Sequence, residues 1–325
     1  MTSNSDFHRI IEFFETRDNF LITSHQDPDG DSIGSLIGLS SFLEGLGKKV
    51  NVYNHGHLPD KYKFLDPTQK IRFDNTPLDF EPEVAIILEC PEIDRIGSVK
   101  NLLKDNMTVV NIDHHPKNKE YGDIIYIDES AAAVAEILYD IIRSNNHTIT
   151  PKIAEAFYAA IASDTGRFKF TNTSAKCFRT VADLVEAGAN AKVISDKLFS
   201  SFSAGTIMLL GQLLKTLKLY DDGRICVLTL MLADLKKYNV QVEDTEGIID
   251  YSLVIEGVKV GALLKERGDN QVKVGLRSQN GINIGKFARS KGGGGHDNAA
   301  GFTVNKPIDA AVDEIVREIS EYLND

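Results

Sequence analysis

Imidazole and carboxylate side chains are concentrated in a short polar stretch, HQDPDGD, which begins at His25. An apolar run at 20–23 precedes it, as is typical of a buried parallel strand, and apolar residues recur at helical spacing from Ser32 onward. His25, Asp29 and Asp31 would therefore occupy a strand-to-helix turn, where open α/β sheets form their sites. Because such groups repel or desolvate one another without a cation, we interpret the turn as half of a metal site. The alternative is an ordinary polar turn in which Asp31 caps the helix.

Acidic and imidazole residues also follow two later apolar runs, at 84–88 and 108–112, and close a long helical pattern at 151–163. These further candidates are Glu89, Asp113, His114, His115 and Asp164. Three of the four clusters thus lie at the ends of predicted parallel strands, and a parallel sheet brings such ends together at one edge. The whole set favours a metal centre over a rim of polar residues that satisfy one another.

The donor types of this set restrict the metal. Imidazole and carboxylate ligands without a thiolate suit Mn²⁺, Mg²⁺ or Fe²⁺ better than a structural zinc ion. These candidates suffice for two ions that share a carboxylate, lower the pKa of a bridging water and clamp a phosphoryl group. The residues therefore indicate metal-assisted hydrolysis of a phosphate ester.

Strands that alternate with helices predict an α/β fold with a doubly wound, mostly parallel sheet and a smaller C-terminal α/β domain. We expect a metal-binding catalytic domain at 1–190, a helical linker at 191–218 and a substrate-binding domain at 219–325. Residues 54–82 are predicted to be mainly loop with a short helix near 59–64, and the glycine run at 292–295 is predicted to be loop.

The composition bounds the function. The chain has 325 residues, a net charge of -11 and three widely spaced cysteines, and it contains no apolar run near the length of a membrane span. We therefore expect a cytoplasmic protein with no membrane partner, and we allow for a homodimer. The net negative charge argues against binding of long nucleic acid, but cations and a few arginines can neutralise the charge of a small phosphorylated substrate.

Four motifs in order, HQDPDGD, IDHHP, ASDTGRF and KGGGGHDNAAGF, resemble the DHH phosphoesterase family with its C-terminal DHH-associated domain. Within that family the chain is most similar to the nanoRNase and pAp-phosphatase group. The resemblance implies two manganese ions, one held by His25 and Asp29. Asp31, His114 and Asp164 would hold the second. The acidic residue after the third strand would bridge the ions, Asp113 would orient neighbouring groups, and His115 would face the substrate phosphate.

One position departs from the family pattern. The family usually has an aspartate after the third strand, where this chain has Glu89. The longer side chain could change the spacing of the metals or the rate, or local backbone shifts could absorb the extra reach. We expect activity to be retained.

The C-terminal region carries a second group of candidates. Glycines allow a backbone to approach a ligand closely and to present N–H donors to an anion, and a histidine beside them can donate to phosphate. The resemblance makes this run the substrate-binding signature and adds an arginine that ends a predicted strand. The residues concerned are Arg277, Ser278, Gly293, Gly294, Gly295 and His296.

The expected function is hydrolysis of short oligoribonucleotides (nanoRNA) to mononucleotides, of 3′-phosphoadenosine 5′-phosphate (pAp) to AMP, or of both. Hydrolysis of linear or cyclic dinucleotides could use the same site. An alternative of another class is a nucleotide-binding protein whose catalysis is weakened by Glu89. The aromatic residues do not alternate with lysine or arginine, which argues against a groove that binds long single-stranded nucleic acid.

Overall fold

The structure is a computed structural model that describes residues 4–324 except 74–75, 116–117, 201, 243–244, 246, 269 and 280, and it leaves undescribed the side chains of residues 4, 5 and 296. The chain divides into two compact units, 1–201 and 202–325. Within the expected linker, the helix α6 (Ala191–Phe199) packs into the core of the first unit and α7 (Ala204–Leu214) into a core of the second.

The first unit contains a six-stranded parallel sheet in the order β3-β2-β1-β4-β5-β6. Its strands are β1 (Phe20–Thr23), β2 (Val50–Asn54), β3 (Ile71–Phe73), β4 (Val84–Leu88), β5 (Thr108–Asp113) and β6 (Ile124–Ile127). The other elements of the unit are α1 (Asn4–Thr16), α2 (Gly30–Gly45), α3 (Val134–Ser144), α4 (Pro151–Asp164), α5 (Ala175–Glu186) and the 3₁₀ segments η1 (Asp60–Tyr62) and η2 (Ile93–Leu102).

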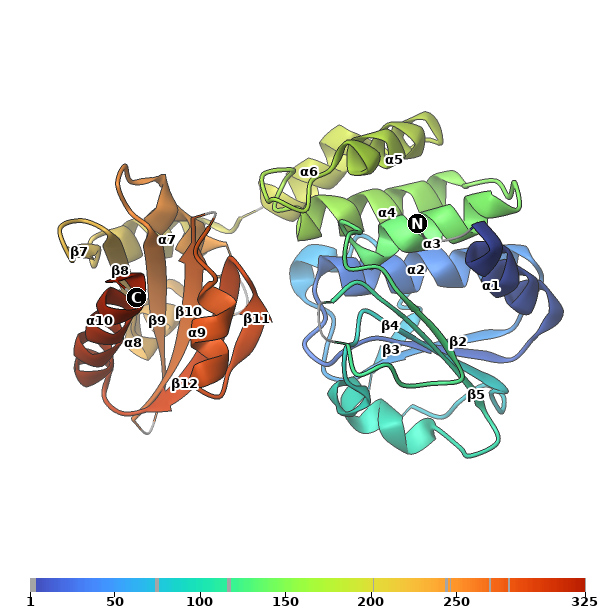
Figure 1. Ribbon diagram of the computed structural model, residues 1–325, viewed down its shortest axis with the longest axis horizontal. Helices are drawn as coiled ribbons and strands as arrows, with labels where there is room; N and C mark the ends of the chain where they lie inside the picture. The colour runs from blue at the N-terminus through green and yellow to red at the C-terminus, as the bar shows by residue number, and fades with distance from the viewer. Residues whose placement is uncertain are drawn as a thin grey trace. The chain divides into compact units, whose positions relative to one another are not determined.

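Both faces of this sheet are covered, which explains its continuous apolar strands. Phe20 and Ile22 of β1 pack in one core with α2 and α4, and Leu21 between them packs in another core with Ile96 and Val99 of η2. Figure 1 shows α2, α3 and α4 together on one side of the sheet. The strand order reverses between β1 and β4, so a topological switch point lies where these two strands end.

Glycines bring α2 and α4 into close contact. A Cβ atom on Gly34 would overlap the carbonyl oxygen of Ala156 and lie 2.8 Å from the Cβ of Ala160. A Cβ atom on Gly30, at the start of α2, would overlap Ser163 near the end of α4. Because the start of α2 therefore lies beside the end of α4, this packing places their terminal side chains close together.

The second unit contains a mixed six-stranded sheet in the order β11-β12-β10-β9-β8-β7, in which only β8 and β9 pair in parallel. Its strands are β7 (Lys218–Tyr220), β8 (Ile225–Leu230), β9 (Val260–Gly268), β10 (Gln271–Ser278), β11 (Gly294–His296) and β12 (Ala299–Asn305). Its other elements, besides α7, are α8 (Leu232–Tyr238), η4 (Ile248–Val254), α9 (Ile284–Ser290) and α10 (Ile308–Asn324). Among the described residues, no single helix is long and apolar enough to cross a membrane, although α6 and α7 reach that length and hydropathy when they are counted together.

The predicted fold class is confirmed, and one local prediction is wrong. The region 54–82, expected to be mainly loop with a short helix near 59–64, contains the 3₁₀ segment η1 and also the short edge strand β3. The glycine run was predicted as loop, but Gly294–His296 forms β11 and pairs with Ala299–Gly301. Gly293 also packs closely, because a Cβ there would overlap the backbone oxygen of Gly301. Glycine has low strand propensity, so pairing with β12 overrides the local preference.

Gly34→Ala is expected to lower the free energy of unfolding by about 1–3 kcal/mol, because the added methyl group overpacks the contact between α2 and α4. Urea unfolding followed by circular dichroism measures this change. Gly45→Ala, in the same helix, is the matched control, since a Cβ there would meet nothing within 4 Å. Equal stability of the two variants would contradict the proposed close contact.

Candidate metal centre

The structure brings the polar residues of the first unit together at the switch point. They come from the ends of β1, β4, β5 and α4 and from the start of α2. The residues gathered there are His25, Asp29, Asp31, Glu89, Asp113, His114, His115 and Asp164. Parallel strands end at one edge of the sheet, and the contact between α2 and α4 adds the remaining carboxylates.

Glu89 lies at the middle of this group. Its side chain is 1% exposed, and its Oε2 atom is 3.0 Å from Nε2 of His25 and accepts a hydrogen bond of 3.1 Å from the Ser32 hydroxyl. Its Oε1 atom lies 3.4 Å from Nε2 of His114 and 3.4 Å from Nδ1 of His115. Burial alone would raise the pKa of Glu89, but the charges of His115 and His25 hold that pKa well below its ordinary value. One carboxylate thus faces both histidine clusters.

Backbone carbonyl groups orient two of the imidazoles. Nδ1 of His25 lies 2.6 Å from the carbonyl oxygen of Gln26, and Nδ1 of His114 lies 3.1 Å from that of Ala131. When each Nδ1–H donates to its carbonyl, Nε2 is left as the ring nitrogen that faces the centre. Burial opposes a charged His25, but Glu89 outweighs this effect and raises the pKa of His25 to about 9.

Asp29 and Asp31 have different local partners. Asp29, rather than Asp31, is the N-cap of α2, and its Oδ1 atom accepts a hydrogen bond of 3.0 Å from the Ser32 amide. The suggested capping role of Asp31 is therefore wrong. Asp31 is fully buried and instead accepts from the amides of Val134 (2.6 Å) and Ala135 (3.2 Å) at the start of α3. Burial and Glu89 raise the pKa of Asp31 to about 7.

Asp164 completes the group from the end of α4. Its Oδ2 atom is 3.8 Å from Nε2 of His114 and accepts a hydrogen bond of 3.3 Å from the Asn172 side chain. Asn172 also donates to the carbonyl oxygen of Ala132 at 3.0 Å. Burial raises the pKa of Asp164 well above its ordinary value, so a nearby positive charge would favour its ionised form.

Asp113 faces its neighbours rather than the middle of the group. Its Oδ1 atom accepts from the amides of His114 (2.8 Å) and His115 (3.2 Å) and lies 2.9 Å from Nδ1 of His115. Its Oδ2 atom accepts a hydrogen bond of 2.6 Å from Asn118. Asp113 thereby sets the orientation of the His115 ring.

These donors fit divalent cations. Two groups each offer three ligand atoms that lie within 4.8 Å of one another, and both groups contain Glu89. One group joins Glu89 with His114 and His115, and the other joins it with His25 and Asp29. Imidazole nitrogens and carboxylate oxygens without sulfur match Mn²⁺, Mg²⁺ or Fe²⁺. A carboxylate that two such groups share can hold a pair of ions.

The candidates at the C-terminus lie in the second unit. Arg277, at the end of β10, pairs with Ala299 of β12. On its other side Ala299 pairs with His296 of β11, so the end of β10 and the backbone of β11 flank the same residue. The side chain of His296 lies outside the described residues. The Arg277 side chain is one-quarter exposed, and its Nε atom is 3.3 Å from Asp250. The buried Ser278 hydroxyl donates to the carbonyl oxygen of Ile282 at 2.7 Å.

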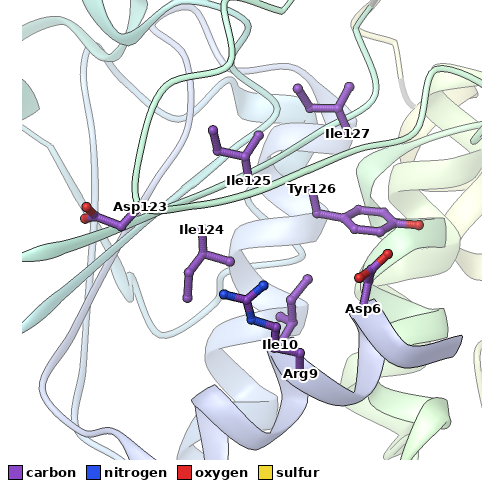
Figure 2. Close-up of a pocket in the computed structure, with 8 residues that line it drawn as sticks. All are labelled: Asp6, Arg9, Ile10, Asp123, Ile124, Ile125, Tyr126 and Ile127. Carbon is purple, nitrogen blue, oxygen red and sulfur yellow. The ribbon is translucent and has the colours of Figure 1, made fainter. Parts of the chain in front are cut away.

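A cavity of about 340 Å³ lies elsewhere, between α1 and the edge strand β6. Figure 2 shows Arg9 and Asp6 of α1 beside the residues of β6. The residues that line the cavity do not include any of the metal centre, so the cavity gives no information on the chemistry of that centre.

Several supporting residues were not identified from the sequence. Ser32, Asn172, Asn118 and the backbone of 131–135 each bond to a member of the group. Ser32 adjoins the first motif, and the other residues have no spacing that marks them.

A divalent cation is expected to stabilise the protein more at about pH 8.5 than at about pH 6.5. In the metal-free protein His25 and Asp31 have raised pKa values, so at low pH they carry protons that the cation must displace. Raising the pH removes these protons, and the affinity for the cation increases. Thermal unfolding with and without Mn²⁺, after dialysis against a chelator, measures the effect. Equal shifts of the midpoint at the two pH values would contradict this assignment.

Comparisons with known proteins identify the family of the chain. Residues 19–161 match the family model described as DHH family, N-terminal domain, and residues 222–325 match the DHHA1 domain. The chain is 31% identical to the bifunctional oligoribonuclease and PAP phosphatase NrnA of Thermus thermophilus, over 93% of this chain and 89% of that protein. It is 26% identical to the protein of the same name from Bacillus subtilis, over 91% of this chain and 92% of that one.

A solved structure shows the same fold. An exopolyphosphatase-related protein from Bacteroides fragilis superposes with a TM-score of 0.92 at 24% identity and covers 99% of this chain and 98% of that chain. The resemblance of the four motifs is thereby confirmed: the chain belongs to the DHH family and carries a C-terminal DHHA1 domain.

Proposed function

We propose that this chain is a divalent-cation-dependent phosphoesterase that cleaves short oligoribonucleotides to mononucleotides and pAp to AMP. The observation that carries the proposal is the single carboxylate of Glu89, which faces two histidine-containing clusters at once. The names of the relatives from Thermus thermophilus and Bacillus subtilis support these two substrate classes. The net charge of -11 supports short substrates over long nucleic acid.

We propose the cation ligands that the resemblance to the family implies. His25 and Asp29 would hold one cation, and Asp31, His114 and Asp164 would hold the other. Glu89 would bridge the two, because each of its oxygens faces a different cluster. Mn²⁺ is the proposed metal, and Mg²⁺ and Fe²⁺ match the same donors.

The protein groups would position the substrate. When bound, the cations would lower the pKa of a water molecule and offset the negative charge of the phosphate. His115, oriented by Asp113, would donate a hydrogen bond to a phosphate oxygen and stabilise the charge that develops during in-line attack. The carbonyl groups of Gln26 and Ala131 would keep the rings of His25 and His114 in their ligating orientation.

The second unit would contribute phosphate recognition. We propose that Arg277 pairs with a phosphate of the substrate in place of Asp250, since a guanidinium binds a phosphate through two parallel hydrogen bonds. Gly294, Gly295 and His296 would supply backbone and imidazole donors. A substrate contact by Gly293 stays a prediction, since its amide already donates to the carbonyl oxygen of Ala288 at 2.9 Å. A substrate contact by Ser278 stays a prediction, and its hydroxyl also accepts a hydrogen bond of 3.1 Å from Asn298.

A panel of substrates with Mn²⁺ tests the function. The panel contains pAp, di- to pentanucleotides, a long single strand and linear and cyclic dinucleotide signals. We expect turnover of pAp and of the shortest oligonucleotides, with rates that fall steeply beyond a few nucleotides. Equal rates on the long strand would refute the proposed preference for short substrates. Exclusive turnover of cyclic dinucleotides would show that the enzyme hydrolyses these signals and not pAp or oligoribonucleotides.

Two variants of Glu89 serve as controls for the panel. Glu89→Gln keeps the shape of the side chain but removes its charge, and roughly a hundredfold or greater loss of kcat/KM is expected. Glu89→Asp restores the residue that is usual in the family. If the natural protein binds pAp without turning it over while Glu89→Asp hydrolyses it, the chain is a nucleotide-binding protein and not an active enzyme.

Arg277→Ala is expected to raise KM for pAp by about 10- to 100-fold, because a charge-assisted hydrogen bond to phosphate is lost. Steady-state kinetics measures KM and kcat separately, and kcat is expected to change less. Arg224→Ala is the matched control, since Arg224 also pairs with an aspartate, Asp221, in the second unit. Similar KM values for the two variants would show that Arg277 does not bind the substrate.

A further inference from the structure

A short segment that belongs to none of the four motifs holds the backbone next to Glu89. The Tyr121 hydroxyl donates a hydrogen bond of 2.8 Å to the carbonyl oxygen of Cys90, and the Asn111 side chain donates to the same oxygen at 3.3 Å. The amide of Lys119 donates to the carbonyl oxygen of Pro91 at 2.9 Å. The carbonyl groups of the two residues that follow Glu89 are therefore both held by side chains or backbone from β5 and from 118–121.

The same segment also holds Asp113. Asn118 donates a hydrogen bond of 2.6 Å to Oδ2 of Asp113 and one of 3.0 Å to Oδ1 of Asn111. Asn111 in turn donates to the Tyr121 hydroxyl at 3.2 Å. A continuous chain of hydrogen bonds, which we call the 118–121 network, thus joins the Cys90 carbonyl to the carboxylate that orients His115.

The backbone of Glu89 explains why such support is needed. Glu89 has a φ of 55°, in the left-handed region that a residue with a side chain rarely adopts. Such a conformation persists only when the surrounding structure holds it in place. The amide of Glu89 donates to the carbonyl oxygen of Ile112 at 3.0 Å, and the 118–121 network holds the carbonyl group of the next residue. The direction of the Glu89 side chain is therefore set from both sides.

We propose that Tyr121 and Asn118 are positioning residues of the metal centre, which keep the Glu89 carboxylate and the Asp113–His115 pair in register with each other. This inference rests on the proposed two-cation hydrolysis, and it adds two residues that no motif marks. Neither residue is proposed to touch the substrate, so their loss acts through Glu89 and His115. Residues that support metal ligands in this way typically change metal affinity or activity when they are altered.

Tyr121→Phe removes only the hydroxyl that donates to Cys90. We expect about tenfold weaker Mn²⁺ binding by calorimetry on the metal-free protein and about tenfold lower kcat on pAp, with KM changed less than about twofold. Asn118→Ala removes the link to Asp113 and is expected to lower kcat by a similar factor with the same small effect on KM. Two variants at different points of the network keep the test decisive if one of them folds poorly.

Tyr139→Phe is the matched control. The Tyr139 hydroxyl donates a hydrogen bond of 2.5 Å to Asp183, which lies in the same unit and is not a member of the metal centre. This variant is expected to lower the unfolding midpoint and to keep the natural kcat and Mn²⁺ affinity. If Tyr121→Phe and Asn118→Ala also lose only thermal stability, the two residues are merely structural and the proposal is overturned.

The calorimetry separates this inference from the proposed function. If the natural protein hydrolyses neither pAp nor oligonucleotides, the proposed function fails. The Mn²⁺ affinities of the natural protein and of the three variants still decide whether the 118–121 network positions the centre, because no substrate is present in that measurement.

Discussion

A buried carboxylate among three imidazoles is the interaction on which the first unit depends. Glu89 is almost completely buried, and a lone buried charge would be costly. His25, His114 and His115 compensate that charge in the metal-free protein and face the positions where cations would bind. The left-handed backbone at Glu89, which costs about 1 kcal/mol or more, is tolerated because hydrogen bonds fix the Glu89 amide and the carbonyl group of Cys90.

The sheet and the helices supply this centre in different ways. The parallel sheet brings the ends of β1, β4 and β5 to one edge, which assembles the imidazoles with Glu89 and Asp113. The helices add the remaining carboxylates, because the glycines of α2 allow α4 to approach and set Asp164 near His114. The start of α3 then neutralises part of the charge of Asp31 through two backbone amides.

The second unit uses glycine for packing as well as for access. Gly293 and Gly295 lie so close to β12 that a side chain on either would overlap its backbone. Gly294 has open space around its Cα atom and is the position where a ligand could approach the backbone. The strand β11 thus completes the sheet edge and contains one glycine, Gly294, at which an added Cβ would meet no neighbouring atom.

The sequence by itself determined the fold class and the residue types of the centre, because apolar runs at strand and helix spacing and clustered histidines and aspartates are local patterns. It also predicted which strand ends carry those residues. Only the tertiary structure decided that Asp29 caps α2, that the glycine run pairs as β11, and that Asn118 and Tyr121 support Glu89. These three features depend on backbone geometry or on contacts between segments distant in the chain. Backbone geometry and distant contacts leave no periodic pattern in the sequence.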